Sequence, residues 1–257
     1  MNNTLKVGLV QYSPVWENPA GSINKIEELL VKHNDNYNLL VFPELTLTGF
    51  TFNVKSFAEE IDGISSKYFI ALAQKLNTDI FAGLIEYEEG KNYNSLIHID
   101  KKGLIKARYR KIHPFSFAGE NNFYNSSKEP IITKIDDIKI GLSICYDLRF
   151  PELYRFYGKE RIDLVVNIAN WPKKRIEHWI ILSKARALEN LTYFIGVNRV
   201  GNDPTNEYNG CSTIISPTGT LVTDYYEDER IINYEINFND VTTTRQQFHF
   251  LDDIKLI

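Results

Sequence analysis

The chain has 257 residues, of which 43% are hydrophobic and 24% are charged, and its formal net charge is −4. This balance predicts a globular chain with a real core, most simply one domain over residues 1–257, and argues against disorder. No apolar run approaches the roughly 18 residues of a membrane span, so a membrane is not an expected partner. The densest basic run is residues 173–175, so nucleic acid is not expected either. Two cysteines and an N-terminus without a signal-peptide pattern predict a reducing compartment, most simply the cytoplasm.

The first half of the chain alternates strands with helices. Short apolar runs predict strands, and apolar residues at helical spacing predict helices. In chain order we expect a strand over 5–12, a helix over 20–34, a buried strand over 39–42, a helix over 65–77, a strand over 80–87, and a hairpin of 93–100 with 104–109. The hairpin is predicted because Lys101-Lys102-Gly103 separates its two strands.

The second half contains one long helix and several strands. The expected elements are strands over 138–144 and 164–168, a short helix after Pro151, a helix over 175–190, and strands over 193–197, 212–216, 221–225 and 231–236. Helices that alternate with apolar strands early in the chain, and hairpins late, predict an α/β fold with mixed sheets.

Cys145 lies at the end of the apolar run 138–144. An apolar strand that ends abruptly at a thiol predicts a sharp strand-to-helix turn, which exposes the side chain at the carboxyl end of a sheet. Backbone N–H groups at such a turn favour a thiolate. We expect Asp147 and Arg149 to form an ion pair that braces the turn. Cys211 has no comparable neighbours in the sequence and is expected to be structural.

Polar side chains also follow three other predicted strands. Glu44 follows residues 39–42, Lys111 follows the second hairpin strand, and Asn170 follows the strand that begins at residue 164. Because ligands bind outside the carboxyl ends of strands in open α/β sheets, we expect these side chains to meet Cys145 in one pocket. A carboxylate can deprotonate a thiol, and an ammonium with a backbone N–H can hold an oxyanion. The set therefore predicts hydrolysis of an amide or nitrile through a thioester.

Each of these residues also has an ordinary structural interpretation. A lone cysteine after an apolar run is usually buried filler, and Glu44 alone could cap a helix or pair with a surface lysine. Lys111 belongs to a basic stretch, although alternation along the strand places Arg108 and Arg110 on the opposite face. The histidines have no metal-ligand spacing and there is no Gly-rich phosphate loop, so neither a metal nor another cofactor is expected.

Three ordered segments resemble the nitrilase superfamily of carbon–nitrogen hydrolases. They are Phe42-Pro43-Glu44-Leu45, Tyr109-Arg110-Lys111-Ile112-His113-Pro114-Phe115 and Cys145-Tyr146-Asp147-Leu148-Arg149-Phe150-Pro151-Glu152. Further segments, at 117–120, 170–172, 178–179, 185–190 and 198–201, resemble the bacterial omega-amidase branch, and the resemblance extends from residue 7 to about residue 250. One departure is Pro114, where the family often has Leu.

The resemblance implies a fold and a set of roles. The fold is a four-layer α-β-β-α sandwich with two mixed β-sheets, a single carbon–nitrogen hydrolase domain without a cofactor, and two copies form a homodimer. Glu44 is implied to be the general base, Lys111 the oxyanion stabiliser and Cys145 the nucleophile. Glu120 matches a second glutamate beside the lysine, and the N–H of Tyr146 completes the oxyanion hole. A loop glutamate in a Gly-Glu-Asn-Asn sequence is otherwise usually solvated.

The branch resemblance also implies a substrate class: small dicarboxylate monoamides such as 2-oxoglutaramate and succinamate. Asn170 and Trp171 are expected to line the pocket, and Lys173, Lys174 or Arg175 to bind the distal carboxylate. The alternative, which the sequence favours equally, is that these basic residues form a solvated helix start. The three segments do not separate this activity from hydrolysis of nitriles, N-carbamoyl compounds or other linear amides. An idle binding protein and a thiol redox sensor are the alternatives outside hydrolysis.

Overall fold

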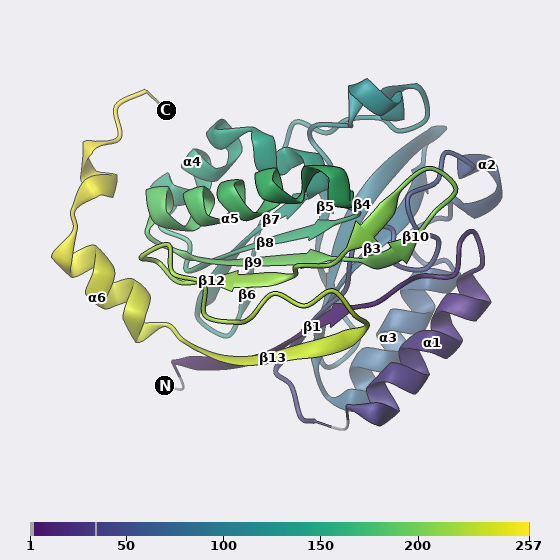
Figure 1. Ribbon diagram of the computed structural model, residues 1–257, viewed down its shortest axis with the longest axis horizontal. Coiled ribbons are helices and arrows are strands. Elements are labelled where there is room, and N and C mark those ends of the chain that lie inside the picture. The colour runs from purple at the N-terminus through teal and green to yellow at the C-terminus, as the bar shows by residue number, and fades with distance from the viewer. Residues whose placement is uncertain (1–2, 34, 257) are drawn as a thin grey trace.

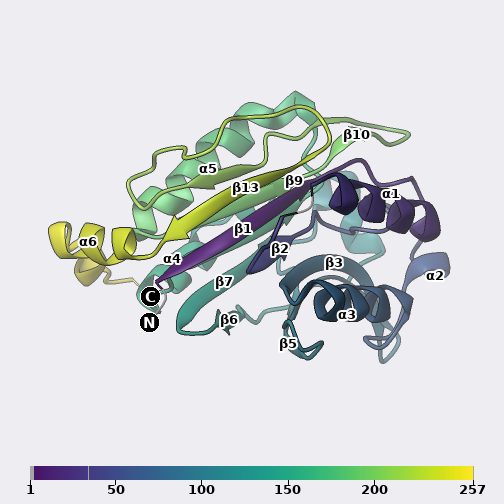
Figure 2. The same ribbon diagram turned by 90° about the horizontal axis from the view of Figure 1, so that it is seen from below.

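The computed structural model describes residues 3–33 and 35–256, which form two large sheets with helices on their outer faces (Figures 1 and 2). The first sheet has the strand order β13-β1-β2-β3-β4-β5. Its strands are β1 (Thr4–Gln11), β2 (Leu39–Val41), β3 (Asp79–Glu88), β4 (Lys91–Ile99), β5 (Ile105–Arg110) and β13 (Arg230–Asn237). The pairs β1–β2 and β2–β3 are parallel and the others antiparallel, so the sheet is mixed.

The second sheet has the strand order β12-β9-β8-β7-β6 and is also mixed, because only its three central strands are parallel to one another. Its strands are β6 (Ile132–Ile135), β7 (Ile138–Ile144), β8 (Leu164–Ala169), β9 (Tyr193–Asn198) and β12 (Thr213–Ile215). A separate antiparallel ribbon consists of β10 (Val200–Asn202) and β11 (Glu207–Asn209).

The two sheets face each other across the main core. Alternate residues of β1 show the division: Val7 and Leu9 pack in the same cluster as Leu142 and Val166 of the second sheet, whereas Val10 packs with the helices on the other side. Successive side chains of a strand point to opposite faces, so a strand buried on both sides has apolar residues on each face.

Helices cover both outer faces of the sheet pair. On the first sheet lie α1 (Pro19–Lys32) and α3 (Ile64–Leu76), which contribute Ile26 and Phe69 to the second cluster. On the second sheet lie α4 (Pro151–Lys159) and α5 (Ile176–Asn190), which contribute Tyr154 and Trp179 to the main core (Figure 1). The predicted four-layer α-β-β-α sandwich is confirmed.

The smaller helices lie at the periphery or beside the carboxyl ends of the strands. They are α2 (Val54–Phe57), α6 (Asn239–Gln247) and 3-10 turns at Ser116–Ala118, Glu120–Asn122, Cys145–Arg149, Lys173–Arg175 and Phe250–Asp253. Within residues 3–33 and 35–256, no helix has both the length and the apolar character needed to cross a membrane.

One predicted element is wrong, and several short ones were not predicted. Residues 221–225 form no strand; Leu221 makes a single bridge to Ile215 after the turn, and the chain then continues irregularly. The strands β6, β10 and β11 have only three or four residues, too few for a clear periodic signal. Helix α6 buries a single large apolar side chain, Val241, so it has no apolar stripe to recognise.

Candidate active site

Cys145 lies at a sharp turn between β7 and the 3-10 turn Cys145–Arg149. Its φ angle of 46° is left-handed, a conformation that costs a non-glycine residue ~1 kcal/mol or more and reverses the chain direction within one residue. The turn is held from the neighbouring strand, because the Cys145 N–H donates to Oδ1 of Asn167 at 3.1 Å. The amide of Asn167 in turn donates to Ser143 and Tyr154. The predicted strand-to-helix turn is therefore confirmed.

Glu44 follows β2 and is completely buried. Its Oε1 accepts hydrogen bonds from Nζ of Lys111 at 2.8 Å and from Nδ2 of Asn94 at 2.7 Å. Its Oε2 accepts from the backbone N–H of Asn170 at 2.7 Å, and the Asn170 amide donates to the Glu44 carbonyl. The carboxylate is thus fixed by one residue within β4 and by two residues that follow β5 and β8, rather than by a surface lysine.

Lys111 connects two carboxylates in the same buried cluster. Besides Glu44, its ammonium donates to both carboxylate oxygens of Glu120, at 3.1 and 2.9 Å. Glu120 is buried, so the interpretation as a solvated loop residue is wrong. Although burial alone lowers the pKa of Lys111, Glu120 and Glu44 raise it well above its ordinary value, so the side chain stays cationic. Asn94, on β4, donates to both carboxylates and was not singled out from the sequence.

The other basic residues of β5 point away from this cluster. Arg108 and Arg110 both pair with Glu86, at 2.7 and 2.5 Å, on the opposite face of the strand. The alternation predicted from the sequence is confirmed, and Lys111 alone among these cations reaches Glu44.

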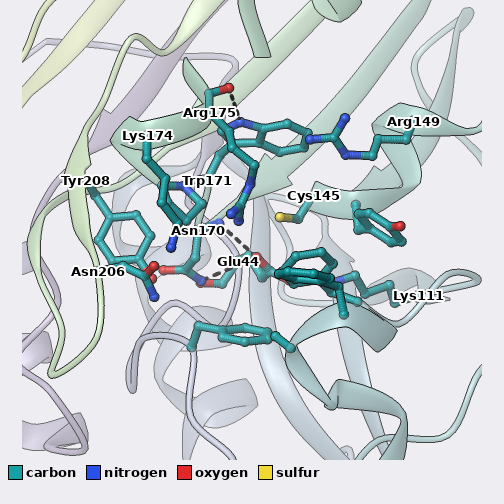
Figure 3. A pocket seen from close by; sticks show the side chains of 16 residues that line it. Glu44, Lys111, Cys145, Arg149, Asn170, Trp171, Lys174, Arg175, Asn206 and Tyr208 are labelled. Carbon is teal, nitrogen blue, oxygen red and sulfur yellow. Dashed lines mark hydrogen bonds and ion pairs between the residues drawn. The ribbon is translucent and has the colours of Figure 1, made fainter. Parts of the chain in front are cut away.

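A single pocket opens over these groups, and Figure 3 shows its lining. Its cavity of about 140 Å³ suits a small metabolite rather than a polymer. Cys145 is partly exposed to it, and Asn170 and Trp171 lie on its wall. The lining residues are Glu44, Phe50, Lys111, Phe115, Phe117, Ala118, Cys145, Tyr146, Arg149, Asn170, Trp171, Pro172, Lys174, Arg175, Asn206 and Tyr208.

The surroundings of Cys145 raise the pKa of its thiol. Burial is the largest cause that raises its pKa well above the ordinary range, and the Glu44 carboxylate raises it further, while Lys111 acts in the opposite direction. Burial and Glu44 thus act against the thiolate that backbone N–H groups at the turn are expected to favour, and that expectation stays a prediction. A thiol needs a base when it reacts, and Glu44, the charged group with the largest effect on this pKa, lines the same pocket.

The predicted ion pair between Asp147 and Arg149 does not form. Asp147 is buried and accepts hydrogen bonds from the hydroxyl of Tyr109 at 2.7 Å and from the backbone N–H of His113 at 2.9 Å. Arg149 points into the pocket, where its guanidinium lies 4.9 Å from the Trp171 ring and donates to His178. Its position on the pocket wall was missed, because a two-residue spacing in a turn does not fix the direction of a side chain.

The three consecutive basic residues at 173–175 differ in their surroundings. Lys173 pairs with Glu207 at 2.6 Å on the surface and does not line the pocket. Lys174 lines the pocket but is exposed, whereas Arg175 is half-buried over the Phe115 ring. Within the described residues, neither Arg175 nor Arg149 has a carboxylate at ion-pair distance, so both guanidinium groups are available to an anionic ligand.

The fold and the pocket agree with the family assignment. The model of the carbon–nitrogen hydrolase family matches residues 6–246, nearly the whole chain. The chain therefore belongs to the carbon–nitrogen hydrolase family and is a hydrolase of carbon–nitrogen bonds.

Individual relatives agree with this assignment. The chain is 31% identical over 252 residues to 2-oxoglutaramate amidase of Bacillus subtilis, covering 97% of each protein. It is 29% identical over 247 residues to the omega-amidase YafV of Escherichia coli, covering 95% of this chain and 94% of that protein. Among solved structures, a carbon–nitrogen hydrolase superfamily protein of Xanthomonas campestris with an arsenic adduct in its active site superposes with a TM-score of 0.92 at 29% identity, over 99% of this chain and 98% of that one.

Proposed function

We propose that the chain is an omega-amidase, which hydrolyses the terminal amide of small dicarboxylate monoamides such as 2-oxoglutaramate or succinamate to the acid and ammonia. The observation that carries this proposal is a small pocket lined by the Cys145 thiol, by Glu44 and Lys111 of a buried Glu–Lys–Glu cluster, and by two arginines that have no carboxylate partner among the described residues. The names of the amidase relatives support the same substrate class.

Acylation begins with the protonated thiol. Glu44 takes the proton of Cys145 as the sulfur attacks the amide carbon, and the carbonyl electrons move onto oxygen. The ammonium of Lys111 and the N–H of Tyr146 hold this oxyanion; the first N–H groups of a helical turn have no partner inside the turn. When the oxyanion collapses, the C–N bond breaks, Glu44 returns the proton to nitrogen, and ammonia leaves a thioester on Cys145.

Deacylation repeats these steps with water. Glu44 takes a proton from water as its oxygen attacks the thioester carbon, and Lys111 again holds the oxyanion. The C–S bond then breaks, the proton on Glu44 passes to the sulfur, and the carboxylic acid leaves. Glu120 has a positioning role here: by accepting from Lys111 it fixes the ammonium beside Glu44 and balances its charge in the buried cluster.

The distal carboxylate of the substrate requires a cation away from Cys145. Arg149 and Arg175 both lie on the pocket wall next to Trp171 (Figure 3). The Trp171 ring lies beneath the Arg149 guanidinium, and its indole N–H donates to the Arg175 carbonyl. Charge-assisted hydrogen bonds from one or both are worth about 1.5–3 kcal/mol each, enough to favour a dicarboxylate monoamide over a neutral amide. Lys174 is closer to solvent and contributes less.

The test is a steady-state comparison of ammonia release. The wild-type protein is assayed with 2-oxoglutaramate, succinamate, glutamine, the neutral amide butyramide, an N-carbamoyl amino acid and a simple nitrile. The proposal predicts the highest kcat/KM for the monoamides that carry a distal carboxylate. A higher kcat/KM for butyramide, the carbamoyl compound or the nitrile would contradict it.

A further inference from the structure

The ribbon β10–β11 forms one wall of the pocket. Asn206, in the turn of the ribbon, and Tyr208, on β11, both line the cavity. Figure 3 shows them on the far side of the pocket from Cys145, with Lys174 beside them. An acyl group attached to Cys145 must therefore fit within the space between the sulfur and this wall.

A buried arginine supports the ribbon from beneath. Arg199 immediately precedes β10 and is completely buried. Its guanidinium lies 4.4 Å from the centre of the Tyr208 ring, and it donates to the carbonyl groups of Val200 at 3.1 Å and Asn202 at 3.0 Å. Nη1 of Arg199 has no hydrogen-bond partner, and in the described part of the chain no carboxylate pairs with this group. Burying a cation without an anionic partner costs free energy. Its presence beneath the ribbon therefore favours a role in holding the ribbon in place.

The other end of the ribbon is held by Asp203. The Tyr208 hydroxyl donates to Oδ2 of Asp203 at 2.5 Å, while Oδ1 accepts from the backbone N–H groups of Thr205 and Asn206, each at 2.7 Å. Although burial raises the pKa of Asp203, these hydrogen bonds lower it below its ordinary value, so the carboxylate stays ionised. The ring of Tyr208 is thus fixed at its face by a cation and at its hydroxyl by an anion.

We infer that the β10–β11 ribbon sets the length of substrate that the pocket accepts. Tyr208 and Asn206 are the specificity-determining residues, and Arg199 is a positioning residue that holds Tyr208 against the cavity. This inference rests on the proposed function for the identity of the substrates. The effect of the wall on substrate length does not depend on it, because a neutral amide of the same length contacts the same wall.

The experiment compares two matched series of amides. One series carries a distal carboxylate: succinamate, glutaramate and adipamate. The other is neutral: butyramide, valeramide and hexanamide. Tyr208→Ala opens the wall and should move the preference toward the longest member of each hydrolysed series by about tenfold or more in relative kcat/KM. Asn206→Phe, at a half-exposed site, narrows the cavity and should move the preference toward the shortest.

Matched variants separate positioning from general damage. Arg199→Met should broaden the length preference as Tyr208→Ala does, Arg199→Lys should restore part of the selectivity, and Glu207→Gln, on β11 but outside the cavity, should leave the preference unchanged. Unchanged length preference in folded Tyr208→Ala and Asn206→Phe overturns the inference. If the wild-type protein hydrolyses only the neutral series, the proposed function is contradicted, but the neutral series still tests the role of the ribbon. If it hydrolyses neither series, both the proposed function and the inference about the ribbon are contradicted.

Discussion

Cys145 and Cys211 have the same backbone conformation and different surroundings. Both adopt a left-handed φ, 46° and 54°, at a turn beside a strand of the second sheet. Burial raises the pKa of both thiols, that of Cys211 to about 11. Cys211, however, lies under α5, where its carbonyl accepts from the indole N–H of Trp179, and it does not line the pocket.

The difference between the two sites lies in what faces the sulfur. Cys145 opens to a cavity and has the buried carboxylate of Glu44 and the ammonium of Lys111 on the same wall. Among the described residues, the one hydrogen-bond donor to the sulfur of Cys211 is the amide of Asn209, at a weak 3.9 Å. A turn and a thiol are therefore not enough to define a nucleophile; an adjacent base and an oxyanion donor must also be present.

The largest expected effect on turnover comes from replacing the two cysteines, one at a time, by alanine. Cys145→Ala should reduce ammonia release at least about a thousandfold, because the covalent step is lost. Cys211→Ala should keep near-normal turnover and lower the melting temperature slightly. Steady-state assays and thermal unfolding of both proteins measure this, and substantial turnover by Cys145→Ala would remove the basis of the mechanism.

Removing the cation from the Cys145 site should have the next largest effect. Lys111→Met leaves two buried carboxylates without their shared partner, which should lower the free energy of unfolding by about 3–5 kcal/mol. In the fraction that folds, the lost oxyanion donor should lower kcat by a factor on the order of 100. Lys106→Met, an exposed lysine on the same strand, is the control in denaturant titrations and assays. Equal stability of the two variants would refute the buried network.

Removing a pocket arginine should affect only anionic substrates. Arg149→Met or Arg175→Met should raise the KM for succinamate about tenfold or more, since a charge-assisted contact is lost, and leave the KM for butyramide within about twofold. Lys173→Met, whose ammonium already pairs with Glu207, is the matched control. The same rise in KM for both amides would argue against a carboxylate site at these arginines.

The smallest effect concerns the rate at which the thiol is alkylated. An ordinary cysteine has a pKa of about 8.5, above which its alkylation rate levels off. Because the pKa of Cys145 is raised, the thiolate fraction should keep increasing about tenfold per pH unit through pH ~9. The rate of iodoacetamide modification, followed by peptide mass in the Cys211→Ala protein, measures this. A plateau below pH ~8 would indicate a stabilised thiolate instead.

The sequence predicts the location of the site better than its shape. Glu44, Lys111, Cys145 and Asn170 each follow a predicted strand, and the carboxyl ends of parallel strands gather at one edge of a sheet, so their meeting follows from topology. Asn94 left a weaker signal, because it is one of several polar residues in β4, together with Asn92, Ser95 and His98. Such a residue could be flagged as buried and polar, but its partners could not be named.

Side-chain directions in turns and short strands could not be predicted. Arg149 and Asp147 were expected to pair, but tertiary partners outside the segment, Tyr109 and His113, occupy the carboxylate. In the pocket wall, Tyr208 lies on a strand of three residues and Asn206 in the turn before it, and such short elements have no periodicity that would reveal them. In both cases the deciding contacts are distant in sequence.

The most direct measurement of the central claim is the covalent state of Cys145 during turnover. Wild-type protein mixed with excess succinamate is quenched in acid at successive times within the first turnover, digested and weighed. We predict a transient succinyl adduct on the peptide that contains Cys145, formed together with the first ammonia and absent from the peptide that contains Cys211. Ammonia released while Cys145 stays unmodified at every time point, or an adduct on another residue, would contradict the account.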